Sequence, residues 1–234
     1  MKYNTISTFT SKRNSVCLAN SYQQLGAITE QVVIKNFGAN TECFRKELEI
    51  SQILSEHDIS VPKVLTVEEN SIIYEYIHGT IMLDLLEQFE QQPNNKSILE
   101  AFDKMCYWLY RCYNALEQHY NYEIILGDAH LRNFIYSFQS VYGIDFECAT
   151  PGKREKDIAH LAVIIVTYTP ICTTAKYQLA AHICKRCMKL MELDAHLLQQ
   201  EMSEQLAVIS SRRKITLPGE IVSEIWSRVL SANL

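Results

Sequence analysis

The chain has 234 residues, of which 47% are hydrophobic and 21% charged, which is typical of a globular protein with a well-buried core. Its formal net charge of −5 and the lack of a long basic run argue against a nucleic-acid-binding surface. The longest apolar run, residues 158–166, is far shorter than the roughly 18 residues of a membrane span. Residues 1–20 contain no apolar stretch typical of a secretory signal, so we predict a cytoplasmic protein.

The first third of the chain has the pattern of a small sheet. Five segments are rich in β-branched and aromatic residues and are separated by polar stretches, which is typical of strands. They are residues 4–10, 16–22, 31–37, 64–67 and 72–76. Residues 41–56 have helical spacing of apolar positions, and Asn40 or Thr41 can cap that helix. The sequence therefore predicts a five-stranded antiparallel sheet with one helix after its third strand.

From about Gly79 onward the pattern becomes mostly helical. Helical spacing covers residues 82–91 and 97–120, and from Asp157 on it predicts four more helices, broken near Pro170, Leu193 and residues 217–219. Two short strands, residues 134–138 and 142–146, are predicted between these helical parts. The predicted fold class is α+β, with residues 1–77 as a sheet-rich lobe and residues 78–234 as a helical lobe.

Residues 126–133 and 142–147 contain the strongest chemical signal. Asp128, Asn133 and Asp145 occupy loop positions beside short apolar strands. We expect Asp145 to end a strand, where alternation would put it on the side opposite Ile144 and Phe146. A carboxylate in such a place is costly to bury unless a cation offsets its charge. Phosphoryl transfer requires carboxylate and amide groups that hold a metal ion against the phosphates. It also requires a further carboxylate that accepts the proton of the hydroxyl.

The pattern G-D-x-H-x-x-N at residues 127–133, followed by I-D-F-E at residues 144–147, resembles the aminoglycoside phosphotransferase and choline kinase group of the protein-kinase-like superfamily. The resemblance implies one bilobal kinase-like domain that uses ATP and Mg²⁺, with Asp128 as catalytic base and Asn133 and Asp145 as magnesium ligands. The spacing of five from Asp128 to Asn133 matches the kinase loop H-R-D-x-x-x-x-N. His130 and Glu147 are more typical of the small-molecule branch than of protein kinases.

Residues 32–35, V-V-I-K, resemble the lysine motif on the third strand of this superfamily. Strand alternation puts Lys35 on the face that carries Val33 and Phe37. Glu47 falls within the apolar face of the predicted helix, where its carboxylate needs a cation, and Lys35 is the candidate. The resemblance implies that this pair orients the α- and β-phosphates of ATP.

Two other segments resemble conserved parts of the superfamily. Residues 72–79 resemble the hinge, which implies Tyr74 as gatekeeper and the backbone of Glu75 and Ile77 as the adenine contact. Residues 152–159 resemble the G-x-x-x-x-D-[LI]-A segment that follows the metal loop. We expect Asp157 in it to cap a buried helix and to brace the catalytic loop, which is a structural role.

Two departures from the pattern keep alternatives open. Residues 10–15, where the phosphate-covering loop is expected, contain no glycine. The nucleotide would then be held by the side chains of Lys12 or Arg13, or would bind only weakly. Alternatively, the segment is an ordinary polar turn. Leu126 stands where the family usually has histidine. The leading hypothesis is a phosphotransferase that acts on a hydroxyl-bearing small molecule. The alternatives are a nucleotide-binding pseudokinase and a protein-directed serine/threonine kinase, and the sequence does not indicate the acceptor, ATP against GTP, or the oligomeric state.

Overall fold

The structure is a computed structural model that describes residues 2–9, 13–22, 28–93 and 95–231. The backbone groups into two compact units. The first unit comprises Met1–His78 with Gly143–Cys148, and the second comprises Gly79–Tyr142 with Ala149–Leu234. The fold class is α+β, with an antiparallel sheet and one helix in the first unit and mostly helices in the second, as predicted.

The first unit is built on a five-stranded antiparallel sheet, which confirms the predicted sheet. Its strands are β1 (Lys2–Phe9), β2 (Ser15–Tyr22), β3 (Ile28–Asn36), β4 (Val64–Glu68) and β5 (Ser71–Glu75). The spatial order is β1-β2-β3-β5-β4, so β3 lies at the centre between β2 and β5. The residue pairs Val33↔Tyr74 and Lys35↔Ile72 set the register of the two central strands.

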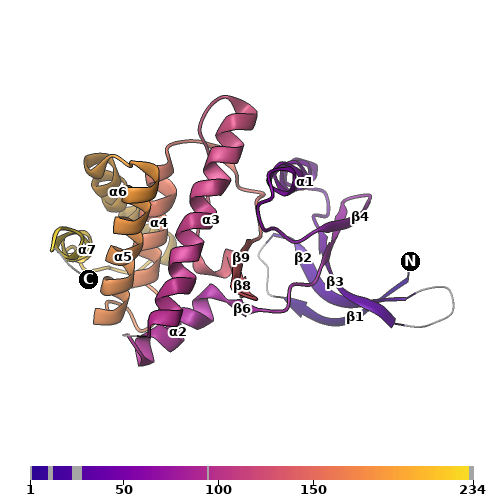
Figure 1. Ribbon diagram of the computed structural model, residues 1–234, viewed down its shortest axis with the longest axis horizontal. Helices are drawn as coiled ribbons and strands as arrows, with labels where there is room; N and C mark the ends of the chain where they lie inside the picture. The colour runs from indigo at the N-terminus through magenta and orange to yellow at the C-terminus, as the bar shows by residue number, and fades with distance from the viewer. Residues whose placement is uncertain (1, 10–12, 23–27, 94, 232–234) are drawn as a thin grey trace. The chain divides into compact units, whose positions relative to one another are not determined.

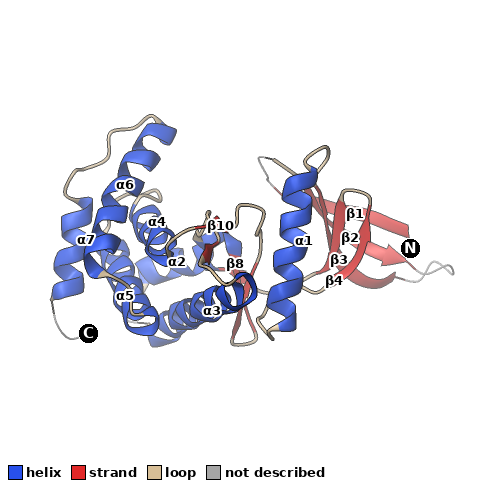
Figure 2. Ribbon diagram, turned by 90° about the horizontal axis from the view of Figure 1, so that it is seen from above, coloured by secondary structure: helices blue, strands red, loops and turns tan. Residues whose placement is uncertain are grey.

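Helix α1 (Thr41–Glu56) lies along one face of this sheet, as Figure 2 shows. The side chain of Asn40 caps the helix by accepting a hydrogen bond from the backbone N–H of Cys43. Phe44 and Leu48 of α1 pack on a buried cluster of the sheet that includes Phe37. Lys35 lies on this same face, with its ammonium 4.9 Å from the centre of the Phe37 ring, as strand alternation predicts.

The second unit is mainly helical (Figure 1). Its helices are α2 (Met82–Gln91), α3 (Lys96–Tyr120), α4 (Arg154–Val166), α5 (Thr174–Met191), α6 (Ala195–Arg213) and α7 (Ile221–Leu230). Helix α4 is buried along nearly its whole length and packs against α5 and α6. It is therefore the central helix of this unit, and polar groups on it must find partners inside the protein.

Short strands and one turn of 3₁₀ helix connect these helices. They are β6 (Thr80–Ile81), β7 (Ile124–Ile125), η1 (Leu131–Asn133), β8 (Phe134–Ser137), β9 (Ser140–Gly143) and β10 (Thr150–Pro151). β6 pairs with β8, and β7 pairs with β10. The predicted strand 142–146 is wrong in its second half, because β9 ends at Gly143 and Asp145 adopts a left-handed conformation with φ 67°. Strand alternation therefore does not determine the direction of the Asp145 side chain.

Candidate functional site

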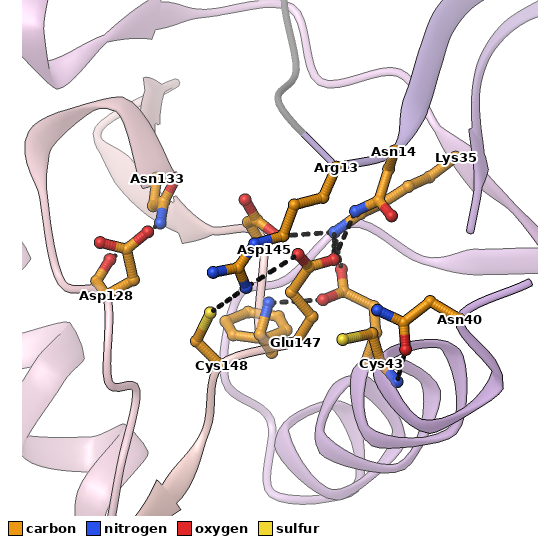
Figure 3. A network of polar contacts seen from close by, with 12 residues as sticks. Arg13, Asn14, Lys35, Asn40, Cys43, Asp128, Asn133, Asp145, Glu147 and Cys148 are labelled. Carbon is orange, nitrogen blue, oxygen red and sulfur yellow. Dashed lines mark hydrogen bonds and ion pairs between the residues drawn. The ribbon is translucent and has the colours of Figure 1, made fainter. Parts of the chain in front are cut away.

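Lys35 of β3 is the centre of a buried charge cluster in the first unit (Figure 3). Its side chain reaches three carboxylates, although the residue is only 7% exposed. Its Nζ lies 3.3 Å from Oε1 of Glu47, 2.6 Å from Oδ1 of Asp145 and 3.4 Å from Oε2 of Glu147. The predicted ion pair between Lys35 and Glu47 is therefore present, and Asp145 joins it.

The charges in this cluster depend on each other. Burial alone would lower the pKa of Lys35, but the carboxylates of Glu47 and Asp145 outweigh burial and raise it, so the amine is charged. Burial raises the pKa of the Glu47 carboxyl, and the Lys35 ammonium opposes that shift. Glu47 also accepts the backbone N–H of Phe146 at 2.5 Å and the hydroxyl of Tyr74 at 3.2 Å. These bonds tie α1 to the segment that carries Asp145.

Glu147 connects the same cluster to the expected phosphate-covering loop. Residues 10–12 of that loop lie outside the described residues, whereas Arg13 and Asn14 are described. The side-chain amide of Asn14 donates to Glu147, and the Arg13 guanidinium lies 3.8 Å from the same carboxylate. Arg13 also donates to the sulfur of Cys148 at 3.4 Å (Figure 3). At Arg13 and Asn14, the described part of this loop therefore presents polar side chains that contact the buried acid Glu147.

The cluster has one more negative group than positive groups when all its members are ionised. Glu47, Asp145 and Glu147 face Lys35 and Arg13. The side chain of Asp145 is 43% exposed, and Lys35 engages its Oδ1. Within the described residues, no group of three or more His, Cys, Asp and Glu is arranged to hold a metal alone. Magnesium needs only one or two carboxylates when substrate phosphates supply other ligands, so the Asp145 carboxylate fits such an ion.

The second unit carries the loop with Asp128 and Asn133. Asn133 ends the 3₁₀ turn η1, and its backbone N–H donates to the carbonyl of His130 at 2.9 Å. Its side-chain nitrogen donates to the carbonyl oxygen of Asp128 at 3.0 Å (Figure 3). The side-chain oxygen is the remaining polar atom of the Asn133 amide, and an amide oxygen is a suitable ligand for a hard cation. The side chain of Asp128 is 37% exposed, so an external hydroxyl can reach it.

Asp157 on α4 braces the start of this loop. Its carboxylate, on a residue only 2% exposed, accepts the backbone N–H groups of Leu126 at 2.6 Å and Gly127 at 3.1 Å, and the hydroxyl of Tyr113 at 2.9 Å. Gly127 has φ 74°, a conformation that favours glycine. The expectation that Asp157 caps the helix is wrong, because α4 begins three residues earlier, at Arg154. The side chain therefore points into the loop instead of satisfying a helix end.

Two histidines flank Asp128. The Nε2 atom of His130 lies 3.6 Å from Oδ2 of Asp128, and the Nε2 atom of His160 on α4 lies 3.8 Å from Oδ1. Sequence reasoning missed His160, because it read residues 158–166 as an apolar run. A lone polar residue inside such a run was the available signal, since a buried imidazole needs partners.

The predicted adenine contact at Glu75 and Ile77 stays a prediction. The backbone N–H of Glu75 donates to the carbonyl of Lys63 at 3.0 Å, and the Glu75 carboxylate accepts the backbone N–H of Lys63 at 2.8 Å. The backbone N–H of Glu75 is therefore already used within the protein. Ile77 lies two residues beyond the end of β5, outside regular secondary structure.

Of the predicted site residues, Lys35, Glu47 and Asp145 lie together in the first unit, and Asp128 and Asn133 lie together in the second. Helices of the described part of the chain are all too short or too polar to cross a membrane.

Comparison with known proteins identifies the type of fold. The family model of the RIO domain matches residues 20–162. A solved structure of the amicoumacin kinase hAmiN, in complex with AMP-PNP, Ca²⁺ and Ami, is similar to this chain with a TM-score of 0.63. The two share 13% sequence identity, and the match covers 95% of this chain and 86% of that one. No curated protein matches the sequence. Both matches lie within the protein-kinase-like superfamily, whereas the finer resemblance to aminoglycoside phosphotransferases and choline kinases stays a prediction.

Proposed function

The chain belongs to the RIO domain family, and from this premise we propose that it transfers the γ-phosphoryl group of ATP to a hydroxyl group. The observation that carries the proposal is the buried ammonium of Lys35, surrounded by Glu47, Asp145 and Glu147. The fixed ammonium suits the phosphates of a nucleoside triphosphate. The partly exposed carboxylate and the excess of negative charge suit the divalent cation that binds with it.

The proposal gives a part to five residues of the first unit. Glu47 holds Lys35 in place, and Lys35 contacts the α- and β-phosphates. On nucleotide binding the bond of 2.6 Å between Lys35 and Asp145 is exchanged, so that Asp145 can hold Mg²⁺. Mg²⁺, when bound, supplies positive charge that offsets the charge developing on the phosphate oxygens. Glu75 and Ile77 are proposed to hold the adenine through their backbone.

The second unit supplies the group that acts on the acceptor. Asp128 accepts the proton of the attacking hydroxyl, and its exposure of 37% leaves it open to the acceptor. Asn133 contributes its amide oxygen as a further magnesium ligand, since its nitrogen is already used by the Asp128 carbonyl. Asp157 fixes the loop by binding the N–H groups of Leu126 and Gly127.

We propose a small molecule as the acceptor. Only six residues separate Glu147 from the start of α4 at Arg154, and two of them, Thr150 and Pro151, are paired with β7. A segment this short offers few residues to bind a peptide substrate. It also offers few residues whose phosphorylation could regulate activity. The RIO domain match favours a second candidate, because it hints at an atypical protein kinase whose acceptor is a protein hydroxyl.

A turnover assay separates these candidates. Full-length chain with Mg²⁺ and ATP would be tested against aminoglycosides, amino-alcohols, sugars and nucleosides, and against casein as a protein acceptor. We expect phosphorylation of a small molecule and a loss of at least about 100-fold in rate for Asp128→Ala. Asp84→Asn, an exposed acid on α2, is the matched control and should retain the rate.

Transfer to casein alone would favour the protein kinase. ATP binding without any transfer would identify a pseudokinase, and equal rates for Asp128→Ala and wild type would remove Asp128 as the base.

A further inference from the structure

His160 is a buried imidazole that faces Asp128 without bonding to it. The residue is 9% exposed and lies on α4, the central helix of the second unit. Its Nε2 lies 3.8 Å from Oδ1 of Asp128, beyond hydrogen-bond distance, and has no hydrogen-bond partner among the described residues. A buried nitrogen without a partner costs stability, so its presence beside the proposed base calls for a functional explanation.

Gln205 of α6 determines which imidazole nitrogen carries the hydrogen. Its side-chain oxygen lies 3.0 Å from Nδ1 of His160, and Gln205 is itself only 8% exposed. With Oε1 of Gln205 placed toward Nδ1, this amide oxygen accepts and Nδ1 donates, so the lone pair of neutral His160 is left on Nε2. Burial lowers the pKa of His160, which favours this neutral form near pH 7. The structure therefore directs a basic nitrogen toward Asp128.

The pair has a reason to remain unbonded in the resting protein. Ionised Asp128 and the Nε2 lone pair are both acceptors, and two acceptors cannot form a hydrogen bond without a proton between them. When Asp128 takes a proton from the acceptor, its carboxyl group becomes a donor, and a small approach of the two side chains forms an O–H···N bond. His160 is therefore arranged to act on the protonated state of Asp128.

We propose that His160 is a positioning residue that relays the proton away from Asp128, which rests on the phosphotransferase function proposed above. In the balanced step, the O–H bond of the attacking hydroxyl or water breaks as its oxygen bonds to the γ-phosphorus. The bond from that phosphorus to the bridging oxygen breaks, and ADP leaves. The proton passes to Oδ1 of Asp128 and then to Nε2 of His160, and solvent takes it up when the products leave.

Three charged or titratable groups face His160 and set its protonation. Asp128 favours the imidazolium form, whereas His130 and Arg212 of α6 disfavour it. His130 flanks the other carboxylate oxygen of Asp128, and its side chain is 19% exposed against 11% for that of His160. His160 is the more buried of the two and has its second nitrogen anchored by Gln205, which makes it the better relay.

The experiment measures ATP hydrolysis by the full-length chain, with Mg²⁺-ATP as the probe and water as the acceptor, across about pH 5.5 to 9. His160→Gln, which cannot take up a proton, should lower kcat about 10- to 100-fold while leaving KM for ATP within about twofold. Gln205→Glu keeps the acceptor for Nδ1 and adds a negative charge, so the acidic limb of the pH profile should move up by about one pH unit. His182→Gln is the control, because His182 pairs with Asp103 elsewhere in the second unit and should leave kcat unchanged.

Two results would overturn the relay: wild-type kcat in folded His160→Gln, or an acidic limb that does not move in Gln205→Glu. A titration of the His160 imidazole by NMR is independent of turnover. We expect Asp128→Asn to lower its pKa, and an unchanged value would overturn the coupling itself. If the wild type hydrolyses no ATP and phosphorylates no acceptor, the proposed function fails and the relay with it. The titration then still decides whether the two side chains are coupled.

Discussion

Asp157 fixes the start of the loop that carries Asp128. Its two oxygens accept three hydrogen bonds, two of them from the backbone N–H groups of Leu126 and Gly127. Gly127 is held with φ 74°, so the loop needs both a residue that tolerates this conformation and an acceptor that fixes it. An asparagine at position 157 would keep one acceptor but turn an amide nitrogen toward a donor, which costs about 1–3 kcal/mol.

The same residue makes stability depend on pH. Burial raises the pKa of Asp157 from 3.8 to about 6, so the folded protein binds more protons than the unfolded chain across that window. Its contribution to stability is present below about pH 4 and is lost as pH rises to about 6, by roughly 3 kcal/mol. The urea midpoint of wild type should therefore fall relative to that of Asp157→Asn as pH rises from about 4 to 6.5. Asp58→Asn, at an exposed position, should run parallel to wild type. A constant gap between wild type and Asp157→Asn would contradict the prediction.

At the scale of elements, the spacing of apolar residues was enough to predict the helices and strands whose structure depends on local sequence. Helix α1 begins and ends at the predicted residues, and the five predicted strands form one antiparallel sheet, because a half-buried helix or sheet leaves a regular apolar pattern. The left-handed turn at Asp145 and the two-residue strands β6, β7 and β10 left no such pattern, since contacts distant in sequence create them. In the candidate site, the pairing of Lys35 with Glu47 could be predicted because a buried acid needs a cation. The contact of His160 with Asp128 could not, because it joins residues that are far apart in the sequence and meet only in the folded chain.

The pairing of β6 with β8 depends on a glycine. A Cβ atom at Gly79 would lie 2.6 Å from the carbonyl oxygen of Tyr136 and 2.7 Å from the Ile135 side chain. Tyr136 is the partner of Thr80, so its backbone cannot move without weakening the strand pair. Gly79→Ala should therefore lower the free energy of unfolding by about 1–3 kcal/mol, measured from urea midpoints. Gly219→Ala, where nothing lies within 4 Å of the added atom, should change it by less than about 0.5 kcal/mol. Equal effects of the two substitutions would contradict this prediction.

At the scale of the whole molecule, the residues proposed to act on the nucleotide, its metal and the acceptor hydroxyl are divided between the units. Lys35, Glu47 and Asp145 belong to the first, and Asp128 and Asn133 belong to the second. The RIO domain match, residues 20–162, runs through both units, and the similarity to hAmiN extends over most of the chain. The proposed function gives each unit a magnesium ligand, so we expect substitutions in either unit to weaken binding of Mg²⁺-ATP.

Thermal stabilisation by Mg²⁺-ATP tests that expectation. A ligand at about 100 times its Kd stabilises the folded state by about 2.7 kcal/mol, which for a chain of this size raises Tm by about 5–10 °C. Asp145→Asn in the first unit and Asn133→Ala in the second should each remove most of this rise, because each loses a proposed magnesium ligand. Each shift is taken against the same variant without ligand, so a change in basal stability cancels, and Asp84→Asn should keep the full rise. A full rise in Asn133→Ala would show that the second unit does not hold the metal. The same rise for ATP without Mg²⁺ would indicate nucleotide binding by Lys35 alone, as expected of a pseudokinase.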